Sequence, residues 1–369
     1  MADRKPSRWI YELPKVTFDR QWRLGRATFR PPGEAAAEVA TFAAQATVHD
    51  SWRVAFELAT EVAARWVNSS TVDVEADSDE DANSIASESL AALRFFMREI
   101  VPVNVEIHRI GLVGEVAHAV REYLGVFEGL ERLAVGGSVI DAAVDFRFTT
   151  EDLDKWDSDA RVSWLSSELA LDLESRSIEG RRAITALGLL DRAFLSRDPV
   201  VRVILCAVAV EALLADIEDP NAAKPSMTGS LRIASRVAYL TCGTGCAVDR
   251  PACPYVLGFK GHKHVWAMAE QWSQAGKEWR CSAFLDIARP PDMETYFRRP
   301  SLFGARNEAA HEGRTSLDAS DVTWMRVYAE GAVKAFLSWV ARTHGTVADL
   351  DSEVQAGATR LGLLVPADT

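Results

Sequence analysis

The stretch "DPVVRVILCAVAVEALLADIED", residues 198–219, decides the fold of the C-terminal half of the chain. Asp198 is a typical helix N-cap, and Pro199 follows it at the first helical position, where proline is tolerated. The next residues are apolar on nearly every side, so we expect a central core helix. The run is too short to cross a bilayer, and it contains Arg202 and Glu211.

Glu211 is the charged residue in the middle of this apolar helix. A buried carboxylate is costly unless a partner compensates its charge. Two interpretations stay open. Glu211 lies at the edge of the helix and meets solvent, or it pairs with an arginine of a neighbouring helix. The candidate partners are Arg232, Arg236 and Arg306.

Further helical segments surround the core helix in the sequence. Residues 177–198 are amphipathic, with Ile184, Leu187, Leu190, Phe194 and Leu195 on one side. A helix is also expected over 226–241, and a last one over about 318–343. After residue 241 the helical pattern breaks for about sixty residues. We therefore expect an all-α domain over 176–345 with an insertion over 242–300, followed by a C-terminal tail, 346–369.

The first 175 residues have a mixed pattern. Strands are expected in "WIYELPKVTF", 9–18, in "QWRLGRATF", 21–29, and in "VPVNVEIHRI", 101–110. Helices are expected over 36–67, 84–99 and 115–133. The acidic run "DVEADSDEDANS", 73–84, is expected to be a flexible loop. The fold class is therefore α+β overall, with a mixed α/β domain over 1–175, which could sense a trigger or select a target.

Composition limits the classes of protein that this chain can be. It has 369 residues, of which 48% are hydrophobic and 25% charged, as in an ordinary globular protein. The N-terminus has no apolar h-region, so no signal peptide is expected. We expect a soluble, cytoplasmic protein with no membrane partner. The net charge of −12 does not by itself favour a nucleic-acid partner, although a local patch can oppose it.

The segment "LFGARNEAAHEGR", 302–314, carries the strongest candidate for chemistry. On a helix, Asn307 and His311 share a face, and the long side chain of Arg306 can swing toward them. A guanidinium suits phosphate geometry, and an imidazole titrates near neutral pH. Arg306, Asn307 and His311 are the predicted catalytic residues, with Glu211, Arg236 and Arg299 in support. The alternative is a solvated helix end that happens to carry both groups.

Four sequence elements in this order resemble the HEPN superfamily, specifically its Apea-like branch. They are "RRAITALGLLDRAFLSRDP", "VEALLAD", "SLRIASRVAYL" and "RNEAAHEG". The family hallmark is an Arg, a polar residue, a few further residues and a His, usually followed by Gly. Arg306, Asn307, His311 and Gly313 match it, with Glu312 standing where the Gly often follows the His directly. The resemblance covers less than half of the chain.

The resemblance implies a helical bundle that forms a homodimer, with the Arg-His motifs meeting in one composite site. It implies a metal-independent endoribonuclease of toxin or antiviral defence systems, acting on structured RNA such as tRNA. A phage-derived or small-molecule trigger would then activate it. The alternative is a non-catalytic module that keeps the HEPN bundle for dimerisation and for RNA or protein binding. A third hypothesis is a zinc-stabilised scaffold in which Arg306 and His311 cap a helix.

Residues 242–264 gather three cysteines and two histidines, namely Cys242, Cys246, Cys253, His262 and His264. Three thiolates and an imidazole form an ordinary tetrahedral zinc set. A long insertion with little core can use a metal as a structural staple. We therefore expect a structural zinc ion; which histidine binds it stays open, and Cys281 can replace one of them. The alternative is a set of unrelated residues in a surface insertion.

The same part of the chain is locally basic. Residues 224–314 contain 13 Lys and Arg against 8 Asp and Glu, a net charge of +5, which leaves −17 for the remainder. Arg298 and Arg299 precede the motif, and Lys260 and Lys263 stand near aromatic residues. Phosphate attraction combined with aromatic stacking is how unpaired RNA is usually held. The alternative is scattered, solvated charge.

Overall fold

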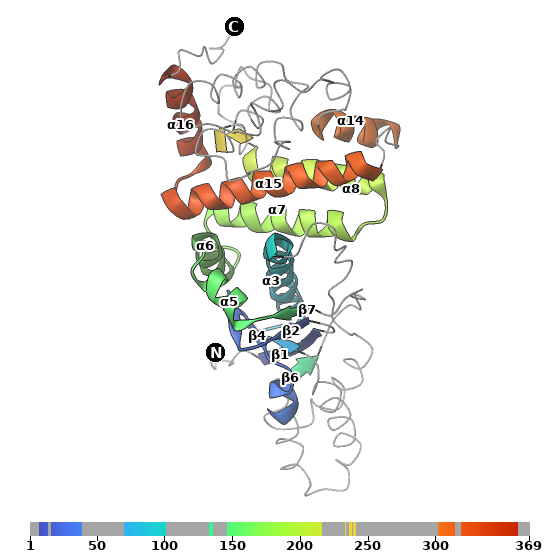
Figure 1. Ribbon diagram of the computed structural model, residues 1–369, viewed down its shortest axis with the longest axis vertical. Coiled ribbons are helices and arrows are strands. Elements are labelled where there is room, and N and C mark those ends of the chain that lie inside the picture. Colours follow the sequence, from blue (N-terminus) through green and yellow to red (C-terminus); the bar gives the residue numbers. More distant parts are fainter. Residues whose placement is uncertain are drawn as a thin grey trace, which may run out of the picture. The chain divides into compact units, whose positions relative to one another are not determined.

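The computed structural model describes residues 7–13, 16–38, 70–100, 133–135, 146–215, 233, 236–237, 239–240, 302–313 and 319–360. The chain divides into two compact units, Met1–Arg176 and Ser177–Thr369. The boundary predicted from the sequence lies between residues 175 and 176. The described residues are mostly helical, with a small sheet in the N-terminal unit (Figure 1), so the chain is broadly α+β.

The N-terminal unit is built on a five-stranded sheet with the order β3-β4-β5-β1-β6. Its strands are β1 (Ser7–Leu13), β3 (Trp22–Leu24), β4 (Ala27–Arg30), β5 (Ser70–Ala76) and β6 (Leu133–Val135). The pairs are antiparallel except β1 with β6, which is parallel. A second, parallel pair joins β2 (Val16–Phe18) to β7 (Phe146–Phe148). The two N-terminal stretches expected as strands are therefore confirmed, each split into two.

Strand β5 corrects the expectation of a flexible acidic loop over 73–84. Its residues Val72, Val74 and Ala76 are fully buried, while Asp73 points to the opposite face. There the Oδ2 atom of Asp73 lies 2.9 Å from Nε of Arg30 on β4. The acidic run thus contains a period-two strand whose charge is compensated across the sheet, and the next helix begins at Asp79.

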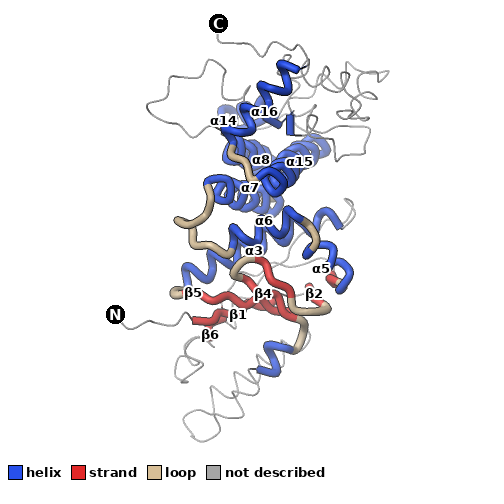
Figure 2. Tube along the Cα trace, turned by 90° about the vertical axis from the view of Figure 1, so that its left-hand side faces the viewer, coloured by secondary structure: helices blue, strands red, loops and turns tan. Residues whose placement is uncertain are grey.

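Helix α3 (Asp79–Ile100) covers one face of this sheet, packing against β4 and β5 (Figures 1 and 2). An aromatic cluster fills the core beside it. Ring centroids lie 4.8 Å apart for Phe18 and Phe148, 4.8 Å for Phe148 and Trp156, and 5.1 Å for Trp22 and Trp156. These rings come from β2, β7, β3 and helix α5 (Thr150–Asp157), so they join segments that are far apart in the sequence.

Two short helices, α5 (Thr150–Asp157) and α6 (Ala160–Leu169), follow β7. Thr149 and Asp152 form a capping box at the start of α5, and Asp159 caps α6 through the backbone N–H of Arg161. Neither helix was predicted from the sequence. Their start points are set by N-capping side chains, and both helices are too short to show a clear apolar periodicity.

The C-terminal unit is helical throughout its described residues. Helices α7 (Ile178–Leu195) and α8 (Pro199–Leu214) form a hairpin, and α15 (Ala319–Thr343) packs against both (Figure 1). Helix α14 (Leu302–Glu312) packs on α8. The predicted start of the core helix is confirmed, because the side chain of Asp198 accepts the N–H of Val200 at 2.8 Å and Pro199 is the first helical residue.

Residues 346–369, expected as a tail, contain a further helix, α16 (Val347–Arg360). Leu350 is fully buried, and the buried Glu179 of α7 accepts the N–H of Val347 at 3.2 Å. The side chain of Glu353 accepts hydrogen bonds from the Tyr239 hydroxyl at 2.9 Å and from Nε1 of Trp339 at 3.2 Å. Helix α16 is therefore part of the packed unit, and residues 347–360 are not a tail.

Several expectations fall outside the described residues. These are the helix over 36–67 beyond residue 38, the strand over 101–110, nearly all of the helix over 115–133, most of the helix over 226–241, and the insertion over 242–300. Among the helices that are described, none combines the length and apolarity required to cross a membrane.

Candidate functional site

An ion pair between helices α8 and α14 is the centre of the candidate site. The Nη2 group of Arg306 on α14 donates to Oε1 of Glu211 on α8. The two side chains are 31% and 27% exposed, so the pair is half-buried at the rim of the helix packing. Of the alternatives left open for Glu211, pairing with Arg306 is therefore the one found, at a position that also meets solvent.

The sequence of α14 explains how Arg306 reaches α8. Ala305 and Ala309 lie one turn apart and are buried to 0% and 2% exposure. Small side chains on the buried face of a helix allow a close approach to its neighbour. Arg306 directly follows the first of these alanines, so its long side chain lies at the edge of the contact and extends across to Glu211.

Asn307 and His311 share the exposed side of α14, four residues apart. The Oδ1 atom of Asn307 accepts a hydrogen bond from Nη1 of Arg306 at 3.0 Å. A guanidinium carries five N–H donors, and the bonds to Glu211 and Asn307 engage two of them. Within the described residues, nothing binds the imidazole of His311. The helix thus presents an arginine held from two sides and an accessible histidine.

Gly313 ends the helix that carries the motif. Its φ of +64° is in the left-handed region, and its N–H donates to the carbonyl of Ala309 at 3.1 Å. This is the usual way in which glycine terminates an α-helix. The glycine of the motif therefore sets the end of α14 directly after His311 and Glu312.

Arg236, expected to support the motif, joins other elements. It is 1% exposed, its Nε donates to Oδ1 of Asp351 at 2.7 Å, and its Nη1 donates to the carbonyl of Leu214. Its Nη2 donates to the second carboxylate oxygen of Asp351. These contacts hold α16 against the C-terminal end of α8. The other supporting residue, Arg299, lies outside the described residues.

The predicted zinc ligands, Cys242, Cys246, Cys253, His262 and His264, also lie outside the described residues, and so does Cys281. The structural zinc ion therefore stays a prediction. Where the chain is described, no three His, Cys, Asp or Glu side chains are arranged to hold a metal ion. Cys206 of α8 is buried and forms no disulfide with a described residue, which suits a small apolar side chain of the core.

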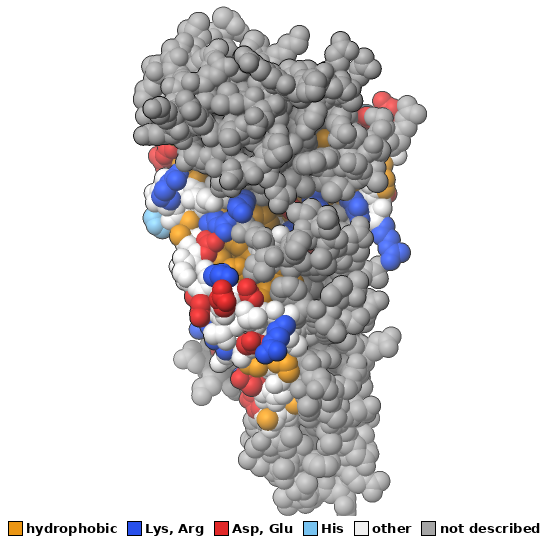
Figure 3. Space-filling view, viewed as in Figure 1, with side chains coloured by type: hydrophobic (Ala, Val, Ile, Leu, Met, Phe, Trp, Pro, Cys, Tyr) orange, Lys and Arg blue, Asp and Glu red, His pale blue; other side chains and the backbone are white. Residues whose placement is uncertain are grey.

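Charges on the described surface are intermingled. On the face drawn in Figure 3, basic and acidic side chains of the described residues lie close to one another, with hydrophobic side chains between them. Several neighbouring arginines and carboxylates of the N-terminal unit are ion-paired, among them Arg20 with Asp154 and Arg147 with Asp19. On this face, the described residues form no continuous basic surface for a nucleic acid.

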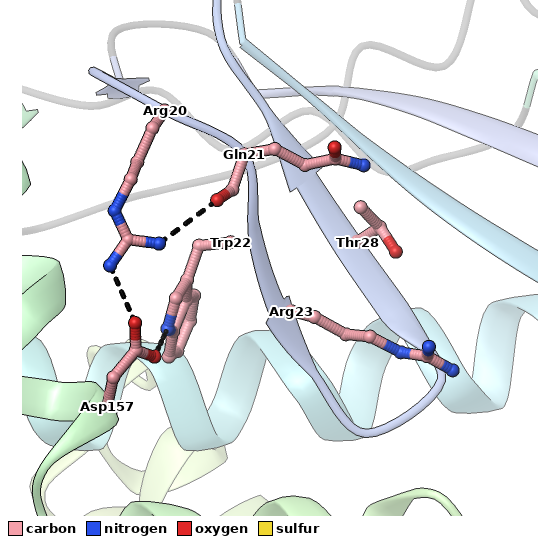
Figure 4. A pocket seen from close by; sticks show the side chains of 6 residues that line it. All are labelled: Arg20, Gln21, Trp22, Arg23, Thr28 and Asp157. Carbon is pink, nitrogen blue, oxygen red and sulfur yellow. Dashed lines mark hydrogen bonds and ion pairs between the residues drawn. The ribbon is translucent and has the colours of Figure 1, made fainter.

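A concavity of about 440 Å³ lies in the N-terminal unit beside β3, the last strand of the described sheet (Figure 4). Its lining residues are Arg20, Gln21, Trp22, Arg23, Thr28 and Asp157. Nε1 of Trp22 donates to Oδ1 of Asp157 at 2.9 Å, and Nη2 of Arg20 donates to Oδ2 of the same carboxylate at 2.6 Å. None of these residues was predicted to belong to a site. The turn "LGRA" is the local sequence signal that brings β3 beside β4.

No protein-family model, curated protein or solved structure matches this chain. The resemblance to HEPN proteins therefore rests on the four sequence elements and the residues of the Arg-His motif.

Proposed function

We propose that the protein is a metal-independent endoribonuclease of the HEPN type, with Arg306, Asn307 and His311 as its catalytic residues. One observation carries this proposal. Helix α14 presents an arginine held by Glu211 and Asn307 together with an accessible histidine on the same helix. Fixing a guanidinium before substrate arrives reduces the reorganisation needed in the transition state.

The proposed reaction needs only these groups and the RNA itself. The 2′-hydroxyl of a ribose attacks the adjacent phosphorus, and the bond from phosphorus to the 5′-oxygen breaks. His311 accepts the 2′-proton or donates a proton to the leaving oxygen. Arg306 stabilises the charge on the phosphoryl oxygens with N–H groups that Glu211 and Asn307 do not use. The products are a 2′,3′-cyclic phosphate and a 5′-hydroxyl end.

Glu211 has a positioning role in this proposal. Its carboxylate offsets the charge of Arg306, which weakens the attraction of the site for phosphate, while its hydrogen bond fixes the guanidinium. We therefore expect Glu211 to orient the guanidinium of Arg306 for catalysis, at the cost of weaker binding of RNA phosphate. Glu211→Gln keeps an acceptor oxygen at the same place and removes the charge, so it separates these two effects.

The remaining features of the proposal come from the resemblance to the HEPN superfamily. The protein would act as a homodimer in which two motifs form one site, in an antiviral defence or toxin system. Its substrate would be structured RNA such as tRNA, and a phage-derived or small-molecule trigger would control it. A structural zinc ion would hold the insertion over 242–300, with no part in the reaction.

The test is cleavage of total bacterial tRNA and mRNA by the purified full-length protein in EDTA. Wild type is compared with Arg306→Ala and His311→Ala. Two controls keep the same residue types: Arg342→Ala, at an exposed site on α15, and His344→Asn, because His344 has a φ of +51° that asparagine tolerates. Cleavage by wild type and both controls, with cyclic-phosphate ends, supports the proposal. Equal cleavage by all variants would contradict it.

A second candidate function is a non-catalytic binding module with a HEPN-like bundle. The observation that favours it is the engagement of Arg306 by Glu211, since an ion pair between two helices also has a purely structural use. The two candidates differ in a filter-binding assay with the same RNA. Retention of intact RNA by wild type, with no cleavage and no loss in His311→Ala, would favour the binding module.

A further inference from the structure

We propose that the outer edge of β3 in the N-terminal unit is a docking site for an extended, acidic peptide segment, which binds as an added strand. The site is formed by Gln21, Arg23 and Thr28 beside the concavity drawn in Figure 4. This inference concerns a different unit from the Arg-His motif, and it is independent of the proposed ribonuclease function.

The hydrogen-bond register of the β3–β4 hairpin leaves the backbone N–H and C=O of Arg23 without a partner on β4. Leu24 pairs with Ala27 across the two-residue turn, and Arg23 pairs with Thr28. In an antiparallel ladder, hydrogen-bonded and non-hydrogen-bonded pairs alternate, and the pair that closes a two-residue turn is hydrogen-bonded. The N–H and C=O of Arg23 therefore point away from β4. Strand β3 is the last strand of the described sheet, and no described strand pairs with it on the side to which these groups point.

Space for a ligand exists at that edge. The concavity of about 440 Å³ follows four consecutive residues, Arg20 to Arg23, and extends to Thr28 on β4. Figure 4 shows Gln21, Thr28 and Arg23 around one side of it, and Trp22 and Asp157 on the other. Strand addition needs space beside the edge strand, because the incoming backbone lies about 4.8 Å from it.

Charge favours an acidic ligand. Six other arginines of this unit lie within 3 Å of a carboxylate oxygen; they are Arg20, Arg26, Arg30, Arg147, Arg161 and Arg176. Arg23 differs from them. Its Nε donates to the carbonyl of Gly25 at 3.0 Å, and no carboxylate of the described residues pairs with it. Its two Nη groups therefore offer the bidentate geometry that suits a carboxylate.

A peptide satisfies this site better than a small anion does. Arg23 offers backbone groups at the sheet edge and a guanidinium on the face that also holds Thr28, its cross-strand neighbour. An added strand binds the backbone groups, and a Glu or Asp side chain on the same face reaches the guanidinium. A free phosphate or carboxylate uses the guanidinium alone. A purely protective role, in which Arg23 keeps other strands away from the edge, predicts no binding at all.

The experiment uses the full-length protein and three synthetic peptides, TVTEVETV, TVTQVQTV and TVTKVKTV. Fluorescence anisotropy measures binding, and hydrogen–deuterium exchange measures protection of the backbone over residues 19–24. We expect saturable binding of the Glu peptide below about 1 mM and roughly tenfold weaker binding of the Gln peptide, since one charge-assisted hydrogen bond is lost. The Glu peptide should also slow exchange over residues 19–24.

Two substitutions separate the backbone from the charge. Arg23→Pro removes the outward N–H at a position where proline leaves the ladder with β4 intact, so it should abolish binding. Arg23→Ala keeps the backbone N–H. It should weaken the binding of the Glu peptide roughly tenfold, to the affinity of the Gln peptide. Arg147→Ala, at an exposed arginine of the same unit, should leave binding unchanged.

Three results would overturn the proposal. The first is no binding of the Glu peptide by a folded wild type. The second is binding that inorganic phosphate displaces completely without any change in exchange over residues 19–24, which would indicate a simple anion site. The third is equal binding of the Glu and Lys peptides, which would show that Arg23 does not select the ligand.

Discussion

Glu211 and Arg306, 95 residues apart in the sequence, form an ion pair that joins helices α8 and α14. Both side chains keep more than a quarter of their surface exposed. Water therefore screens the attraction, and such a pair contributes little to stability. Its main structural effect is to fix the direction of the Arg306 guanidinium, beside Asn307 and on the helix that carries His311.

We expect a small coupling energy between these two residues. The variants are Glu211→Ala, Arg306→Ala and the double variant, compared by urea unfolding. The double-mutant cycle should give about 0.5–1 kcal/mol, as for other partly exposed pairs. Arg342→Ala combined with Glu211→Ala is the control, and it should give no coupling. A coupling above about 3 kcal/mol would mean that the pair is primarily a structural element of the bundle.

The pair of Arg236 and Asp351 should be more important for stability. Arg236 is 1% exposed, whereas Asp351 is 40% exposed. Asp351→Asn leaves a buried guanidinium without its carboxylate, and we expect a loss of about 1–3 kcal/mol in the free energy of unfolding. Because the contact holds α16, hydrogen exchange should accelerate over residues 347–354. The control, Ser352→Ala on the same helix, should change stability by less than about 0.5 kcal/mol. Equal effects of the two substitutions would contradict the structural role of Arg236.

Much of the C-terminal bundle was predictable because its signals are local. Asp198 and Pro199 mark the start of α8 in any context, and the apolar spacing of 177–198 fixes the buried face of α7. Of the residues that this pattern placed on the apolar face, Ile184, Leu187 and Leu190 are buried. Leu195 is not, because it lies at the C-terminal end of the helix and is 36% exposed. Helix α15, expected over about 318–343, occupies Ala319–Thr343. Long amphipathic helices contain enough repeats to average out exceptions.

The missed elements depend on partners far away in the sequence. Strand β5 contains Asp73, whose charge is compensated by Arg30 on another strand, so its acidic residues resemble a loop when considered alone. Helix α16 is held by Arg236, Tyr239 and Glu179 from other helices. Its own sequence has few apolar residues. The periodicity of a short stretch of sequence cannot reveal a contact with a residue more than a hundred positions away.

The candidate site shows the same limit. The sequence offered Arg232, Arg236 and Arg306 as possible partners of Glu211, because helical spacing fixes faces within a helix and not the packing between helices. The structure pairs Glu211 with Arg306 and places Arg236 on Asp351. The turn between β3 and β4 was the only sequence signal for the proposed docking site. The position of β3 at the edge depends on the order of strands in the described sheet, which the sequence pattern does not give.

Two glycines should respond in opposite ways to alanine. Gly25 has a φ of +62°, and a Cβ there would lie 2.4 Å from Cβ of Leu169, so Gly25→Ala should cost at least about 2 kcal/mol. Gly188 lies inside α7, and an added Cβ would meet no atom within 4 Å. Gly188→Ala should therefore stabilise the protein by about 0.5–1 kcal/mol. Chemical denaturation of both variants measures these changes. Destabilisation by Gly188→Ala would mean that α7 has a packing contact at this position.

Stability of the N-terminal unit should decrease in acid partly through Asp159. Burial alone would raise the pKa of this carboxyl, but side-chain and backbone hydrogen bonds from Arg161, the charge of Arg161 and a backbone bond from Val162 together lower it below the ordinary 3.8. The folded state therefore favours the charged carboxylate more than the unfolded state does. The resulting stabilisation is complete above pH 3.8 and is lost as the pH falls through the lower, folded-state pKa.

Asp159→Asn tests this linkage, because asparagine still caps α6 and cannot carry the charge. Wild type should be more stable than Asp159→Asn at pH 7, and the difference should shrink as the pH falls below 3.8. Unfolding by urea at a series of pH values from 7 to about 2.5 measures it. Glu174→Gln, at an exposed carboxylate of the same unit, is the control and should show a much smaller change with pH. A difference between wild type and Asp159→Asn that stays constant over this range would show that the charge of Asp159 does not contribute, and that its cap acts through hydrogen bonding alone.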